Sequence, residues 1–217
     1  MIASISYLDP VLDELQKQWP GNKTVNIVCH GHSVPAGYFA TPYVNTFAAY
    51  PHLLHRIVKE RFPFSVANVI VTAIGGENSE GGAKRFDTEV LNHNPSVVTI
   101  DYALNDRPIG LARALAAWET MIDKALSKDI KVILLTPSWD RSFFANNDDW
   151  LNLKKHAEQV RGLAVRYSVG LADTFLRQGE FVKDAEDAVT LLSHVNHPSK
   201  AGHEIIANEI AKYFMAR

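Results

Sequence analysis

Ser33 is the residue in this sequence best placed to act as a nucleophile. It follows the apolar run at residues 25–29, and Gly31, two positions before it, allows a sharp turn and leaves room beside the hydroxyl for a bulky substrate. A serine in a turn between a strand and a loop is by itself more often structural than catalytic. Its chemistry therefore depends on what lies near it.

Three further polar groups stand in comparable places. Gly76 follows the second apolar run, Asn105 follows the third, and His197 precedes Pro198 at the start of a final helix. A lone histidine, one of nine in the chain, means little. Ligands bind at the carboxyl ends of strands in open α/β sheets, so a serine, a glycine, an asparagine and a histidine in this order predict one shared site.

The elements that must position these residues alternate between strand and helix. Nearly continuous apolar runs predict buried strands at residues 25–29, 66–74, 97–101, 131–135 and 169–173. Apolar residues at helical spacing predict helices at residues 7–19, 47–62, 80–91, 109–127, 152–167 and 199–215. The pattern predicts an α/β fold with three α/β/α layers around about five parallel strands, in a single domain covering residues 1–217.

One connection is too long and too aromatic to be a simple link. Residues 139–150 read W-D-R-S-F-F-A-N-N-D-D-W. Loops of this length between a strand and a helix of an α/β fold tend to be functional. We therefore expect this segment to form a lip over the substrate.

Composition excludes several classes of function. The formal net charge of -2, with 21% charged residues, provides no basic surface for nucleic acid and no polybasic cluster for a membrane. The single Cys29 lies in an apolar run, so we expect a buried, unreactive thiol. No cluster of residues has the spacing of metal ligands, and no phosphate-binding glycine motif is present, so we expect neither a metal nor another cofactor. No signal peptide or membrane span is visible, which predicts a cytoplasmic protein.

Taken in order, these polar residues resemble the sequence blocks of the SGNH (GDSL-like) hydrolase superfamily, esterases with a flavodoxin-like sheet. The family's glycine-aspartate-serine block is similar to Gly31-His32-Ser33, with histidine in the middle, and its isolated glycine matches Gly76. Its glycine-x-asparagine-aspartate block matches residues 103–106, with alanine in the first place. Its aspartate-x-x-histidine-proline block matches residues 194–198, with His194 where the family has aspartate.

The resemblance implies acyl transfer. Ser33 would attack an ester carbonyl, and His197 would take the serine proton and pass it to the leaving alcohol. The backbone N–H groups of Ser33 and Gly76 and the side-chain amide of Asn105 would stabilise the oxyanion. His194 is an uncertain third member, because a neutral histidine accepts one hydrogen bond without the charge of a carboxylate. We therefore expect a Ser–His dyad in which a backbone carbonyl or a water orients His197, and we expect Asp106 to brace its loop.

The expected activity is that of a serine esterase. The family analogy, and the lack of a long apolar lid, predict hydrolysis of short acyl esters, chiefly acetyl esters, on a carbohydrate or other small ester substrate. Two alternatives stay open: a lysophospholipase or thioesterase of the same fold, and a non-catalytic carbohydrate-binding module whose triad has decayed.

Overall fold

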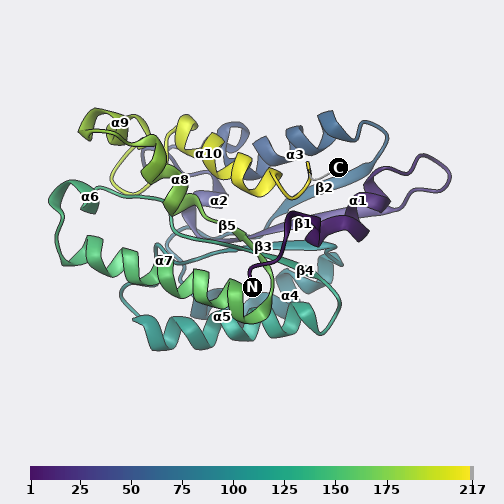
Figure 1. The fold of residues 1–217 in the computed structure, drawn as a ribbon, viewed down its shortest axis with the longest axis horizontal. Helices are drawn as coiled ribbons and strands as arrows, with labels where there is room; N and C mark the ends of the chain where they lie inside the picture. Colours follow the sequence, from purple (N-terminus) through teal and green to yellow (C-terminus); the bar gives the residue numbers. More distant parts are fainter. Residues whose placement is uncertain (216–217) are drawn as a thin grey trace.

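The computed structural model describes residues 1–215, which fold around a five-stranded parallel sheet (Figure 1). The strand order is β2-β1-β3-β4-β5, and the strands span β1 (Thr24–Gly31), β2 (Val66–Val71), β3 (Val97–Asp101), β4 (Lys131–Leu135) and β5 (Gly170–Ala172). This is the predicted flavodoxin-like order. The chain reverses its direction of travel across the sheet between β1 and β3, so the carboxyl ends of these two strands mark the expected ligand site.

Helices cover both faces of the sheet (Figure 1). One layer contains α1 (Asp9–Leu15), α3 (Tyr50–Arg61), α8 (Thr174–Phe181) and α10 (Lys200–Ala211). The opposite layer contains α4 (Ser79–Glu89), α5 (Leu111–Leu126) and α7 (Asp148–Tyr167). Along β4, Ile133 packs with the first layer and the neighbouring Val132 and Leu134 with the second. This two-residue period explains why the central strands are apolar throughout.

Shorter elements complete the chain. They are α2 (Ser33–Ala36), α6 (Ser142–Ala145), α9 (Ala185–Thr190), and the 3-10 helices η1 (Ile5–Leu8), η2 (Thr46–Ala48) and η3 (Leu91–His93). None of the helices among residues 1–215 combines the length and apolar character needed to cross a bilayer.

The structure differs from the predicted elements mainly at their ends. The first predicted helix stops at Leu15, and Trp19, assigned to its apolar face, is 85% exposed. The second strand stops at Val71, although backbone hydrogen bonds to β1 continue as far as Ile74. Helices α8 and α9 were not predicted. Each follows an aspartate, Asp173 or Asp184, whose side chain accepts at least one backbone N–H of the first turn.

Candidate active site

Ser33 begins α2 directly beyond the carboxyl end of β1, and its side chain is buried. The reason for the preceding glycine is close packing. A Cβ on Gly31 would lie 2.5 Å from the carbonyl oxygen of Asp101 and 2.8 Å from the ring of Pro35. Glycine at this position therefore lets the end of β1 pass tightly beside β3, which fixes where the serine emerges.

His197 lies against Ser33, 164 positions away in the sequence. Its Nε2 is 3.0 Å from Ser33 Oγ, and its Nδ1 is 2.7 Å from the carbonyl oxygen of Phe39. A carbonyl oxygen can only accept, so Nδ1 carries the hydrogen and Nε2 is the acceptor that faces the serine hydroxyl. The ring therefore has the tautomer that a general base for Ser33 needs.

The Phe39 carbonyl is presented by the aromatic loop that follows α2. The Phe39 N–H donates to Tyr43 O at 3.0 Å, and Tyr43 N–H donates to Ala40 O at 2.8 Å, so the loop closes on itself. The Phe39 ring packs on His203 with a centroid distance of 4.9 Å. Backbone bonds and ring packing together fix the acceptor for His197.

His194 does not occupy that position. Its side chain is exposed, and among the described residues it makes no hydrogen bond with His197. The acceptor at His197 Nδ1 is the backbone oxygen of Phe39. The group that orients His197 is thus a backbone carbonyl, one of the two substitutes for the family's aspartate, a carbonyl or a water, that we expected from the sequence.

Burial lowers the pKa of His197 below its usual value. The Phe39 carbonyl opposes this shift, and His32 and His194 add to it. The imidazole is therefore neutral, and able to accept a proton, over a pH range that extends below the ordinary pKa of about 6.5.

His32 is a residue whose role the sequence did not suggest. Its Nδ1 accepts the Val34 N–H at 3.3 Å, so it caps α2 as an aspartate or serine commonly does. The same nitrogen is 3.4 Å from Ser33 Oγ, and Nε2 is 3.5 Å from Asp101 Oδ1. The histidine in the middle of the first block thus holds the turn that presents the nucleophile.

Gly76 lies in the loop between β2 and α4 with a φ of +80°. A Cβ there would meet no protein atom within 4 Å, so it is the backbone angle that favours glycine at this position. Within residues 1–215 its N–H has no hydrogen-bond partner, and the residue lines a cleft. This N–H is available to a ligand.

Asn105 follows β3 on the same rim. Its Nδ2 donates to the carbonyl oxygen of Glu77 at 3.0 Å, and the other amide N–H has no partner within the described residues. The neighbouring Asp106 is buried and accepts the Ser79 N–H at 2.8 Å and the Trp118 indole N–H at 2.7 Å. Burial raises the pKa of Asp106, and these hydrogen bonds partly oppose the shift. The predicted bracing role of Asp106 is confirmed.

A cleft of about 1160 Å³ opens beside these groups. Gly76, Asn105 and Asn196 line it, and Asn196 directly precedes His197 in the chain, whereas the buried Ser33 and His197 are not among its lining residues. Its outer wall is the predicted lip; the lining residues from that segment are Asp140, Arg141, Ser142, Phe144, Ala145, Asn147 and Asp149. An ion pair of 2.6 Å between Arg107 and Asp140 ties the lip to the loop after β3.

No group of three or more histidine, cysteine, aspartate or glutamate side chains within residues 1–215 is arranged to hold a metal ion. Burial raises the pKa of the Cys29 thiol to about 12, so it is unreactive as expected.

Comparison with known proteins identifies the family and the fold of the chain. The model of the GDSL-like lipase/acylhydrolase family matches residues 29–205, whereas the sequence matches no curated protein. An acetylxylan esterase from Geobacillus stearothermophilus is similar in structure, with a TM-score of 0.75 and 18% identity over 88% of this chain and 94% of that one. A lipase/acylhydrolase from Enterococcus faecalis has a TM-score of 0.69 and 23% identity over 87% and 95%.

A G-D-S-L family lipolytic protein from Desulfitobacterium hafniense is also similar, with a TM-score of 0.68 and 21% identity over 87% of this chain and 99% of that one. Identities this low show a shared fold. The family match covers most of the chain and supplies the activity class. The chain belongs to the GDSL-like lipase/acylhydrolase family and is an ester hydrolase.

Proposed function

We propose that this protein is a serine esterase that removes short acyl groups, chiefly acetyl, from a carbohydrate. The observation that carries the proposal is the contact of 3.0 Å between Ser33 Oγ and His197 Nε2, with the imidazole held in the productive tautomer by Phe39. A binding module with a decayed site has no need for this alignment.

The reaction uses groups already in place. Ser33 attacks the ester carbonyl while His197 takes its proton, and the imidazolium then protonates the departing alcohol. Gly76 and Asn105 both line the cleft, and in this proposal the Gly76 N–H and the free amide N–H of Asn105 stabilise the oxyanion. Water, deprotonated by His197, then releases the acid from Ser33.

The cleft supports a hydrophilic alcohol as leaving group. Its lining includes four carboxamides, those of Asn105, Asn147, Asn152 and Asn196, together with charged side chains from the lip. Phe144, 45% exposed, offers an aromatic face of the kind that packs on sugar rings. A lysophospholipase would need a continuous apolar channel for its acyl chain, and a lining interrupted by these amide and charged side chains does not favour one.

The first test is hydrolysis of a small chromogenic acetate ester. The wild-type protein should hydrolyse it, and Ser33→Ala should abolish turnover. An organophosphonate ester should label Ser33 alone when the adduct is mapped by mass spectrometry. A label on Ser79 or Ser138, whose buried hydroxyls lack partners in the described structure, would identify a different nucleophile.

The second test concerns the substrate. Specificity constants across esters of increasing acyl length should be highest for acetyl, and acetylated oligosaccharides should be deacetylated faster than acetylated small alcohols. A preference for long acyl chains would support the lysophospholipase or thioesterase alternative.

A further inference from the structure

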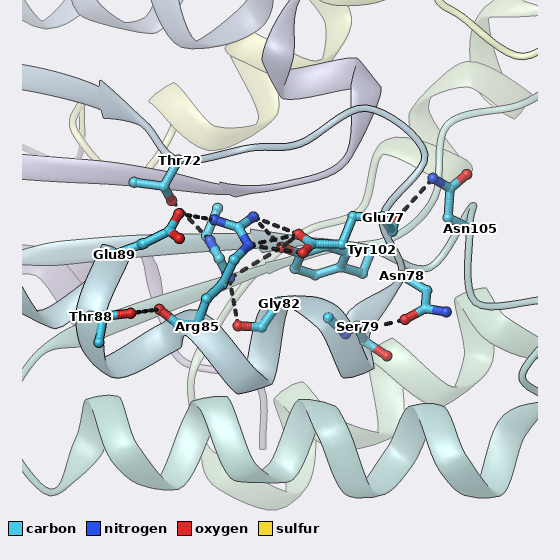
Figure 2. Close-up of polar contacts among 12 residues, drawn as sticks. Thr72, Glu77, Asn78, Ser79, Gly82, Arg85, Thr88, Glu89, Tyr102 and Asn105 are labelled. Atoms are coloured by element: carbon cyan, nitrogen blue, oxygen red, sulfur yellow. Dashed lines mark hydrogen bonds and ion pairs between the residues drawn. The ribbon is translucent and has the colours of Figure 1, made fainter.

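Glu77, the residue after Gly76, is held by an unusually complete set of hydrogen bonds (Figure 2). Its Oε1 and Oε2 accept Arg85 Nε at 2.9 and 3.0 Å, and Oε2 also accepts Arg85 Nη2. The Tyr102 hydroxyl donates to Oε2 at 2.8 Å. The Glu77 and Arg85 side chains are only 14% and 11% exposed, so this ion pair is shielded from the solvent that weakens surface pairs.

The cluster reaches the strand that carries Ser33. Tyr102 Oη is 3.1 Å from His30 Nε2, and the same nitrogen is 3.2 Å from the carbonyl oxygen of Gly82, so Nε2 carries the hydrogen. Burial, with the Arg85 charge, lowers the pKa of His30 to about 4, which keeps the ring neutral. The contacts thus join β1, the loop after β2, α4 and the end of β3.

Two consecutive glycines in α4 make room for these side chains. A Cβ on Gly81 would lie 2.7 Å from Glu77 Cγ, and one on Gly82 would lie 2.4 Å from the Tyr102 ring. Glycine inside a helix is unfavourable relative to alanine. The helix therefore gives up stability at the two positions where the cluster needs space.

The backbone of Glu77 holds two of the three proposed donors of the oxyanion hole, the Asn105 amide and the Gly76 N–H. The Glu77 carbonyl oxygen accepts one N–H of Asn105, which leaves the second N–H of that amide free. The Glu77 N–H donates to Ile74 O at 3.2 Å, which closes the turn that holds Gly76 in its left-handed conformation. A shift of the Glu77 backbone would move both donors together.

We propose that Glu77, Arg85 and Tyr102 are positioning residues that fix the oxyanion hole. The inference rests on the esterase function proposed above. The Glu77 carboxylate, bound by Arg85 and Tyr102, does not contact the reacting atoms. These contacts fix the Glu77 residue, and its backbone in turn holds Gly76 and Asn105. Donors that act in the transition state lose effect steeply when misplaced.

The test compares Glu77→Gln and Tyr102→Phe with Glu89→Gln. Glu89 is the other carboxylate bound by Arg85, at 2.8 Å, and it is half exposed on the solvent side of α4. For hydrolysis of an acetate ester we expect Glu77→Gln to lower kcat about 10- to 100-fold with KM within about twofold. Tyr102→Phe, which keeps the ring against Gly82, should lower kcat by a smaller factor, and Glu89→Gln should leave kcat unchanged.

A double-mutant cycle with Asn105→Ala separates positioning from general loss of stability. If Glu77 acts through the oxyanion hole, Glu77→Gln should cost distinctly less in the Asn105→Ala background than in the wild type. Full additivity would overturn the inference, as would a rise in KM with kcat unchanged or no change in Glu77→Gln and Tyr102→Phe. Thermal melting of each variant shows that folded protein is compared.

Failure of the esterase proposal gives a different result. In that case the wild-type protein would neither hydrolyse acetate esters nor react with the phosphonate at Ser33, and no variant could change kcat. A wild-type enzyme that is active, with Glu77→Gln equally active, would overturn the positioning role alone.

Discussion

Different kinds of hydrogen bond hold the two sides of the proposed active site, the base side around His197 and the oxyanion side around Gly76 and Asn105. On the base side, His197 is oriented by one neutral acceptor, the Phe39 carbonyl, and no carboxylate of the described residues contacts its ring. On the oxyanion side, Glu77, Arg85 and Asp106 bind the loops through charge-assisted hydrogen bonds that are largely shielded from solvent.

This difference indicates where the catalytic power lies. A buried carboxylate beside the base would stabilise the imidazolium that forms as the serine loses its proton. Here that stabilisation is reduced to a carbonyl dipole. The oxyanion side is by contrast fixed in advance, and preorganised donors are usually the largest single contribution in such enzymes. We therefore expect the proposed enzyme to depend more on its oxyanion hole than an enzyme with a complete Ser–His–Asp triad does.

The largest expected effect comes from removing a donor on the rigid side. Asn105→Ala should lower kcat for a short ester by at least about tenfold, and about 10² to 10³ is typical for such donors. KM should change little, because the oxyanion exists only in the transition state. Steady-state kinetics on an acetate ester measure both constants.

The matched control for Asn105 is its neighbour. Asp106→Asn should mainly lower the melting temperature, because Asp106 bonds Ser79 and Trp118 and faces the protein interior. If Asn105→Ala raised KM and left kcat intact, Asn105 would be a ground-state contact and the comparison between the two sides would fail.

A smaller effect should appear in the pH profile, which reports on the base side. His197 must be neutral to accept the serine proton, and its pKa in the fold is lowered, first by burial. Activity should therefore be retained below pH 6.5 and lost as pH falls through the lowered pKa. At pH 6.0 an unperturbed histidine would be about one quarter neutral.

The measurement is kcat/KM between pH 5 and 9, which titrates the free enzyme. The fraction of the maximal value that remains at pH 6.0 should exceed the one quarter expected for an unperturbed histidine. An acid limb centred above pH 6.5 would show that a negative charge stabilises the imidazolium, and a carboxylate would then have to be sought on the base side.

Much of this arrangement could be predicted from the sequence. The apolar runs that became β1, β3 and β4 are short, bounded by turn residues and buried on both faces, so their length and their flanking residues identify them as strands. Parallel strands bring their carboxyl ends to one edge, and that rule predicted a shared site for Ser33, Gly76 and Asn105. The position of His197 followed from the resemblance and from Pro198 after it.

Other features left no clear pattern in the sequence. The acceptor for His197 is a backbone oxygen, which every residue carries, so nothing identifies Phe39 in advance.

The cluster around Glu77, by contrast, did leave a pattern in the sequence. Gly81 and Gly82 are adjacent in a segment with helical spacing, where glycine is unfavourable, and such a pair indicates that side chains from elsewhere occupy the space.

The smallest effect, and the sharpest test of the base side, comes from His194, which stands where the family has aspartate. Because the exposed His194 makes no hydrogen bond with His197 among the described residues, His194→Ala should keep kcat within about tenfold of the wild type across pH 5 to 9. His194→Asp adds a negative charge three residues before the base. If that carboxylate reaches His197, it should raise kcat and move the acid limb of the profile upward, because it favours the imidazolium. A loss in His194→Ala as large as that in His197→Ala would make His194 a required member and refute the dyad. An unchanged His194→Asp would instead show that Phe39 holds Nδ1 so firmly that a carboxylate at residue 194 cannot displace it, which strengthens the view that this side of the site is set by the backbone.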